Sequence, residues 1–271
     1  MSIYSHSRLS TFEQCQLKFK FKYKDNLEPD FEETIEGFLG KQVHKTLEWI
    51  YNKENKEFFF ELDDIIKFFI ESWNKDFNSE IKIIKKNEPV ELYFNKGIKS
   101  IINYFLKNHP FRDNTIATEK KVYVNLDENG KYQLIGFIDR LVQNEDNIFE
   151  IHDYKTGSLK TKEELDKDRQ LALYSIAIRD SFKDVKDVHL IWHFLNHSLE
   201  INSKRTIEEL ENLKKQIINL INKIESTTNF IPNPGYLCNW CEFQSKCPAF
   251  KDYKEKLPIQ KNKVGLINQK I

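Results

Sequence analysis

The sequence predicts an α/β fold in which helices pack on a mixed sheet. The order in which strand-like and helix-like residue patterns follow one another is the basis of this prediction. Between residues 116 and 154, apolar and polar side chains alternate in three stretches that short turns separate, as in neighbouring strands. Amphipathic stretches of helical period precede them, and a helix, a strongly apolar strand and a last helix follow. Three strands joined by turns, followed by a helix and a strand, make a mixed sheet with helices packed on it.

The N-terminal part is predicted to be helical. Residues 10–13 (STFE) fit a capping box, and apolar residues follow at helical spacing from Phe12 to Tyr23. An acidic linker, residues 28–36, separates this helix from the next amphipathic stretch. Further helices are predicted over residues 37–55, 61–79 and 88–108.

The second part begins with the strands. Residues 127–130 (DENG) and 143–147 form the two turns, and the third strand ends at Tyr154. Helices over 163–181 and 207–224 flank an apolar strand at 188–195. A cysteine-rich segment, residues 231–250, and a lysine-rich tail, residues 251–271, complete the chain.

The composition is that of a folded protein of one large or two small domains. Of the 271 residues, 39% are hydrophobic and 31% charged, and the 21 phenylalanines exclude a disordered chain. No apolar run approaches the roughly 18–20 residues of a membrane span and no signal peptide follows Met1, so we expect a soluble, cytoplasmic protein. The 42 basic and 42 acidic side chains cancel, which leaves room for a basic groove without predicting one.

Two carboxylates and an amine are predicted to meet at one end of the sheet. Asp139 lies in GFIDR (136–140) on the second strand, and Asp153 and Lys155 lie in IHDYKTG (151–157) at the end of the third. Residues 153 and 155 leave the same face of a strand. Carboxylates suit Mg²⁺ or Mn²⁺, and a lysine beside the metal can activate water or offset charge on phosphorus. The alternative is a pair of turn-forming aspartates beside a surface lysine.

These motifs, with two others in the same order, resemble the PD-(D/E)XK nuclease superfamily in its RecB-like branch. Besides GFIDR and HDYKTG, the sequence GKQVH (40–44) is similar to the family's helical G-x-x-x-H motif. QLALY (170–174) is similar to its Q-x-x-x-Y motif. The resemblance extends from Ser7 to Cys247 and implies a restriction-endonuclease-like core (αβββαβ) with added N-terminal helices.

The resemblance also implies roles for individual residues. The metal ligands would be His44, Asp139, Asp153 and the carbonyl oxygen of Tyr154, and Lys155 would be the catalytic lysine. Gln170 and Tyr174, one helical turn apart, would line the site or touch the substrate, although Tyr174 also fits a core aromatic. Glu119, at the expected opening of the first strand, ranks below these residues because it adjoins two lysines.

The four cysteines predict a second metal site. Cys238, Cys241 and Cys247 lie within ten residues of a Pro- and Asn-containing loop, and Cys15 is their distant fourth member. Thiolates of this kind bind either a structural zinc ion or an iron–sulfur cluster. The resemblance favours a 4Fe–4S cluster, as in CRISPR-associated RecB-like nucleases and helicase–nucleases, which joins the N-terminal helix to the C-terminal segment.

We therefore expect a single RecB-like nuclease domain over residues 1–250, with a helical insertion at about 56–110. The expected activity is metal-dependent hydrolysis of DNA, as an exonuclease on single strands or free ends, in DNA repair, recombination or CRISPR adaptation. The alternatives are a weakly catalytic or non-catalytic DNA-binding subunit beside a helicase, integrase or second nuclease, and a zinc-stabilised structural protein. Candidate contacts to phosphates are Lys18, Lys22, Lys160, Lys162 and Arg169, although each also fits a solvated surface charge. Candidate stacking residues are Tyr23, Trp192 and Trp240, for which packing in the core is the default.

Overall fold

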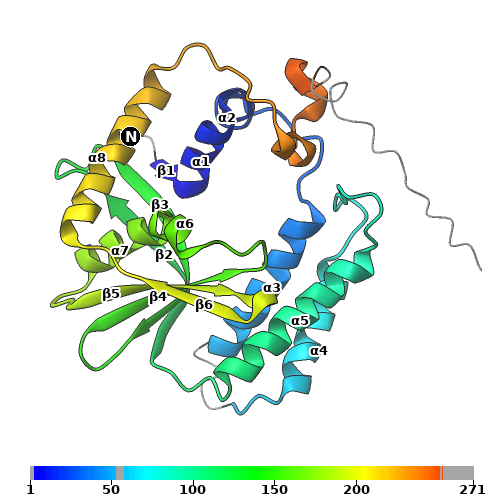
Figure 1. The fold of residues 1–271 in the computed structure, drawn as a ribbon, viewed down its shortest axis with the longest axis vertical. Helices are drawn as coiled ribbons and strands as arrows, with labels where there is room; N and C mark the ends of the chain where they lie inside the picture. Colours follow the sequence, from blue (N-terminus) through cyan, green and yellow to red (C-terminus); the bar gives the residue numbers. More distant parts are fainter. Residues whose placement is uncertain (1–2, 53–57, 251, 253–271) are drawn as a thin grey trace, which may run out of the picture.

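The protein is described by a computed structural model of residues 3–52, 58–250 and 252 (Figure 1). Its centre is a six-stranded mixed sheet with helices on both faces, which confirms the predicted α/β class. The lysine-rich tail, apart from Asp252, lies outside the described residues. No helix of the described part is long and apolar enough to cross a membrane.

The sheet is built around an antiparallel meander. The two strands after it differ in direction, since β5 runs parallel to β4 and β6 runs antiparallel to β5. The short β1 runs parallel to the beginning of β3, whereas β4 pairs only with its end. The strands are β1 (Ile3–Ser5), β2 (Thr115–Asn125), β3 (Gln133–Gln143), β4 (Ile148–Lys155), β5 (Asp187–Phe194) and β6 (Leu199–Ser203).

Helices form a layer on each face of the sheet (Figure 1). One apolar core joins the sheet to α1, α2, α7 and α8, and its largest buried side chain is Trp192. The other core joins α3, α4 and α5 to Tyr154 and Leu195. The helices are α1 (His6–Gln14), α2 (Gln16–Tyr23), α3 (Ile35–Tyr51), α4 (Leu62–Asp76), α5 (Val90–Asn108), α6 (Lys162–Asp166), α7 (Gln170–Ser181) and α8 (Ile207–Ser226).

The predicted N-terminal helix is wrong in its start and in its continuity. It begins at His6, because the side chain of Ser5 caps it by accepting the N–H of Arg8, so the STFE sequence lies inside α1. The helix then breaks at Cys15, whose backbone is extended (φ −159°, ψ 111°). Cys15 starts α2 by accepting the N–H of Lys18 at its sulfur.

The structure also differs from the sequence prediction at three other places. The short strands β1 and β6 were not expected, because three to five residues at a sheet edge carry little periodic signal. The helix expected over 163–181 is two helices. Asp168 separates them, since its side chain accepts the N–H of Gln170 and thereby starts α7.

Candidate active site

Asp139 lies where strands β3 and β4 separate. The pairing between the two strands ends at Arg140 and His152. Beyond this point, the backbone N–H of Tyr154 donates to Oδ2 of Asp139 at 2.8 Å. The carboxylate therefore occupies the place that a strand carbonyl takes in a regular ladder, and its orientation is fixed by the backbone of β4.

His44 reaches the same point from α3. Its Nε2 lies 2.8 Å from the carbonyl oxygen of Tyr154, and its Nδ1 lies 3.5 Å from Oδ2 of Asp139. Because a carbonyl oxygen only accepts, Nε2 carries the proton, and Nδ1 is the ring nitrogen that faces the carboxylate. Gly40, one turn earlier, lies beside Thr156, and a Cβ there would make an ordinary van der Waals contact of 3.4 Å with Oγ1 of Thr156.

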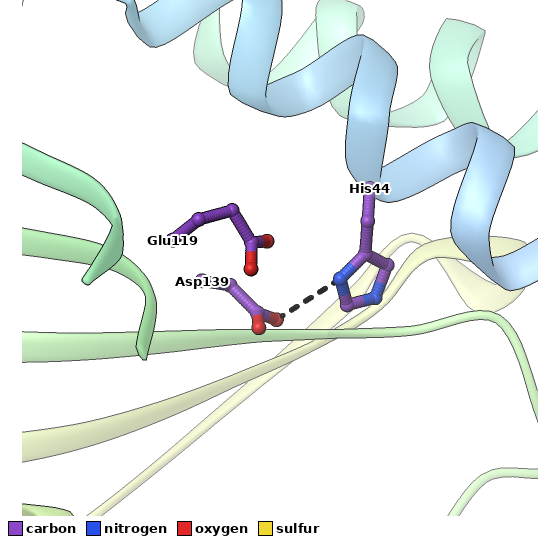
Figure 2. A group of neighbouring side chains, drawn as sticks. All are labelled: His44, Glu119 and Asp139. Atoms are coloured by element: carbon purple, nitrogen blue, oxygen red, sulfur yellow. Dashed lines mark ion pairs between the residues drawn. The ribbon is translucent and has the colours of Figure 1, made fainter. Parts of the chain in front are cut away.

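Glu119 completes a group of three side chains that suits a metal ion. One ligand atom from each of His44, Glu119 and Asp139 lies within 4.8 Å of the other two. Figure 2 shows the three side chains converging on one point from different elements of the fold. An imidazole nitrogen with two carboxylates is a donor set that Mg²⁺ or Mn²⁺ accepts.

The predicted place of Glu119, at the opening of the first strand, is wrong. It lies in the middle of β2, not at its start, and its φ of +44° is a left-handed conformation that costs energy for a glutamate. The register of the β2–β3 hairpin could have indicated that Glu119 lies opposite Asp139. Thr118 pairs with Arg140 and Lys120 with Ile138, so Glu119 stands opposite Asp139.

The electrostatics of the site disfavour ionised Asp139 in the absence of a cation. Burial raises the pKa of Asp139 to about 6, and the charge of Asp153 adds to the effect, although His44 and the N–H of Tyr154 act in the opposite direction. Burial also raises the pKa of Glu119, and the neighbouring Asp139 contributes. A divalent cation between these groups would remove the cost of both charges.

Asp153 and Lys155 form a buried ion pair beside this group. The Nζ of Lys155 lies 2.9 Å from Oδ1 and 2.7 Å from Oδ2 of Asp153, whose side chain is 4% exposed. Gln170 Oε1, at the start of α7, lies 3.3 Å from the same Nζ. Burial lowers the pKa of Lys155, but the charge of Asp153 outweighs it and the net pKa is raised, so the lysine is a cation at neutral pH.

Tyr174 packs in the core beneath the site. It is largely buried, and its ring fills the space over Gly136 so closely that a Cβ there would lie 2.1 Å from the ring. Its pKa is raised by burial, which contacts with Gln170 and the backbone of Phe137 partly offset. The structure thus brings Gln170 and Tyr174 to the same side of the sheet as Asp153, with Gln170 in direct contact with the lysine.

Arg140 supports the site from the face of the sheet that α3 covers, where its guanidinium lies 4.3 Å from the centre of the Tyr51 ring. It is 2% exposed, and its Nε donates to the hydroxyl of Tyr154 at 2.9 Å. The same guanidinium pairs with Asp113 and donates to His152. Since the backbone of Tyr154 contacts both His44 and Asp139, Arg140 fixes the position of two candidate ligands through one residue.

Comparison with known proteins places the chain in a nuclease superfamily. The profile of the PD-(D/E)XK nuclease superfamily matches residues 3–248. The chain belongs to the PD-(D/E)XK nuclease superfamily. No curated protein matches the chain.

Two solved structures are similar to this PD-(D/E)XK chain. A crystal structure named "Putative exonuclease" from Eubacterium rectale has a TM-score of 0.52 and 10% identity, and the match covers 92% of this chain and 87% of the other. The crystal structure of SSO0001 has a TM-score of 0.37 and 16% identity, with 78% and 94% of the chains covered. At 10% identity the first match shows a common fold alone.

The four cysteines of this PD-(D/E)XK chain meet at one cavity of about 350 Å³. Its wall also includes the apolar side chains of Leu17, Phe21, Phe243 and Phe250. The N-terminal helices and the C-terminal segment are held together there by contacts other than sulfur. Asn233 donates to the carbonyl of Gln14 at 2.9 Å, and Glu242 pairs with Lys18 at 2.7 Å. The residues of this cavity are Gln14, Cys15, Leu17, Lys18, Phe21, Pro232, Asn233, Pro234, Gly235, Tyr236, Leu237, Cys238, Cys241, Phe243, Gln244, Cys247, Ala249 and Phe250.

Most of the predicted DNA contacts are engaged within the protein. Lys18 and Lys22 pair with Glu242, Lys160 with Asp168 and Arg169 with Glu13, whereas Lys162 lines a groove beside β6. Trp192 is 0% exposed in the core, so of its two predicted roles core packing is confirmed and base stacking is excluded. Tyr23 packs against the same core, and Trp240 stands beside Tyr236 with ring centroids 4.9 Å apart.

Proposed function

We propose that the protein is a metal-dependent DNA nuclease of the RecB-like branch. The observation that carries the proposal is the convergence of His44, Glu119 and Asp139 within 4.8 Å, next to the buried pair of Asp153 and Lys155. An imidazole, carboxylates and a lysine at the end of a sheet are the groups that phosphodiester hydrolysis requires. A structural role alone gives no reason to place strained Glu119 opposite buried Asp139.

His44, Glu119 and Asp139 would hold Mg²⁺ or Mn²⁺, with Asp153 as a further ligand. The carbonyl of Tyr154, predicted as a ligand, accepts the N–H at Nε2 of His44 on the side of the ring away from Nδ1, so we assign it to holding the imidazole and not to an ion bound at Nδ1. The ion supplies a Lewis acid and lowers the pKa of bound water. The chain's own groups set the geometry: Tyr154 orients Asp139 by its N–H, and its carbonyl holds Nε2–H of His44 so that Nδ1 faces the site. Lys155, a cation, donates to the attacking water and to the phosphate oxygens as negative charge develops.

Lys155→Ala should lower the cleavage rate by about a hundredfold or more and leave Mn²⁺ binding nearly unchanged. The ammonium donates hydrogen bonds and does not ligate, and its removal frees both oxygens of Asp153. Calorimetric titration with Mn²⁺ and a cleavage assay measure the two effects. Lys20→Ala, whose amine pairs with exposed Asp25, is the matched control. A loss of Mn²⁺ binding equal to that of Asp153→Ala would contradict this division of roles.

We propose exonuclease action on single strands or free ends. The similarity in fold to the protein named "Putative exonuclease" supports this choice. We propose that this activity serves DNA repair, recombination or CRISPR adaptation. The protein would act there together with a helicase, an integrase or a second nuclease. The absence of any helix-turn-helix or C₂H₂ signal in the sequence argues against recognition of a base sequence.

Cleavage of end-labelled DNA tests the proposed function. Single-stranded and duplex DNA, labelled at either end, is incubated with the protein in Mg²⁺, in Mn²⁺ or with a chelator. We expect metal-dependent shortening from an end, which Asp153→Ala abolishes. Binding of DNA and Mn²⁺ without cleavage by the wild-type protein would instead support the non-catalytic partner subunit.

We further propose that the four cysteines hold a 4Fe–4S cluster. Among the described residues, no three cysteine sulfurs lie within 4.8 Å of one another, whereas tetrahedral zinc with bonds of about 2.3 Å requires thiolates about 3.8 Å apart. The cubane core of a 4Fe–4S cluster occupies the space between its four thiolates, so their sulfur atoms lie farther apart than around a single zinc ion. Backbone N–H groups point at the sulfurs of Cys15 and Cys238, from Lys18 and Gly235 respectively, as hydrogen bonds to cluster ligands do.

A further inference from the structure

One face of the β2–β3 ribbon carries exposed aromatic side chains in line with the candidate metal ligands. Lys121 pairs with Phe137, and Tyr123 pairs with Ile135, in the same antiparallel register that places Glu119 opposite Asp139. Side chains two residues apart on a strand share a face and stand about 7 Å apart. Phe137 is therefore the next residue along the ribbon from Asp139 on this face, and Lys121 and Tyr123 follow Glu119 in the same way.

This face is open, whereas the opposite one is covered. Val122, Val124 and Leu134 point to the core that α7 completes, and Gly136 lies under Tyr174. On the open face, Phe137 is 51% exposed and Tyr123 is 46% exposed. The Nζ of Lys121 lies 5.3 Å from the centre of the Tyr123 ring.

The chemistry of this strip matches unpaired nucleotides. Aromatic rings offer stacking surfaces that every base can use, and an amine beside them offsets phosphate charge. Bases in a duplex are already stacked on one another, so exposed rings on a flat sheet face favour a single strand. The position of Phe137 next to Asp139 on the same face matters most. A single DNA strand that runs along this face, with one phosphate at the metal ligands, places a neighbouring nucleotide within reach of Phe137.

We infer that Phe137, Lys121 and Tyr123 form a binding strip for single-stranded DNA that leads into the active site. The inference rests on the proposed nuclease function and names the side chains that hold its single-stranded substrate. Phe137 stacks on the base nearest the scissile phosphate, Tyr123 stacks on a base farther along, and Lys121 contacts the phosphate between them.

Binding of a fluorescent single-stranded oligonucleotide and of its duplex, in Ca²⁺ to support binding without cleavage, tests the strip. Phe137→Ala and Tyr123→Ala should each weaken single-strand binding about tenfold and change duplex binding less than about twofold. Phe137→Trp should restore it. Lys121→Ala should reduce the slope of log Kd against log salt by about one. Phe58→Ala, at a phenylalanine 67% exposed in the segment preceding α4, is the matched control and should have no effect.

A set of oligonucleotides with one abasic position each gives the decisive measurement. For the wild-type protein, an abasic site at one position near the cleaved bond should weaken binding about tenfold relative to the intact oligonucleotide. For Phe137→Ala, which already lacks the stacking ring, the same abasic oligonucleotide should bind as well as the intact one. Equal losses for single strand and duplex, or equal sensitivity of both proteins to every abasic position, would overturn the strip while the nuclease function stands. A wild-type protein that neither binds nor cleaves DNA would overturn both.

Discussion

Asp139→Asn should abolish cleavage and at the same time stabilise the metal-free protein. Cleavage should fall by about a thousandfold or more, with loss of Mn²⁺ binding, because a neutral amide cannot replace the carboxylate as a ligand. The free energy of unfolding at pH 7.5 should rise by roughly 1–3 kcal/mol, since burial raises the pKa of Asp139 to about 6 and the ionised side chain is costly in the folded state. Thermal unfolding in a chelator and calorimetry measure both effects.

The pH dependence of the stabilisation identifies its cause. A raised carboxyl pKa means that the folded protein binds the proton more tightly than the unfolded chain, so the cost of Asp139 is fully present above about pH 6. The advantage of Asp139→Asn should therefore shrink as pH falls from 6 towards 4. Asp76→Asn is the control of opposite sign, because hydrogen bonds from Lys45 and Gln42 lower the pKa of Asp76 and its replacement should destabilise. A destabilised Asp139→Asn protein at neutral pH would show that Asp139 serves the fold.

Cys15→Ser should remove the brown colour of the anaerobically purified protein and lower its melting temperature by about 10 °C. Cys15 lies between α1 and α2, far in sequence from the other three cysteines, yet all four line one cavity. Loss of this ligand removes a cross-link between the two ends of the chain. Iron content, visible absorbance and thermal unfolding measure the result.

The control for this experiment lies in the same interface. Asn233→Ala removes the hydrogen bond to the carbonyl of Gln14 and leaves every sulfur in place. It should cost about 1 kcal/mol and leave the iron content unchanged. A Cys15→Ser protein with the iron content and melting temperature of the wild type would contradict the four-cysteine site, and a colourless wild-type protein that contains zinc would support the zinc alternative.

The sequence by itself determined the class of fold and the strands of the meander. Alternating side chains and the DENG turn (127–130) predicted β2, β3 and β4 to within a few residues, because local periodicity reports which face of a strand is buried. The second turn, residues 143–147, also fixed the neighbouring positions of Asp139 and Asp153. The edge strands β1 and β6 escaped detection, since a strand of a few residues gains its stability from the partner with which it pairs.

Only the tertiary structure decided which site residues contact one another. It joined His44 to Asp139 and Glu119, and it kept Asp153 in an ion pair with Lys155. These relations depend on the backbone of Tyr154, which donates to Asp139 and accepts from His44, and no spacing in the sequence encodes such a contact. Likewise, the exposure of Phe137 reversed what its residue type suggests, because the packing of α7 decides which sheet face meets solvent. The motifs determined which residues carry chemistry, and the packing of α3 and α7 on the two faces of the sheet determined which of them meet.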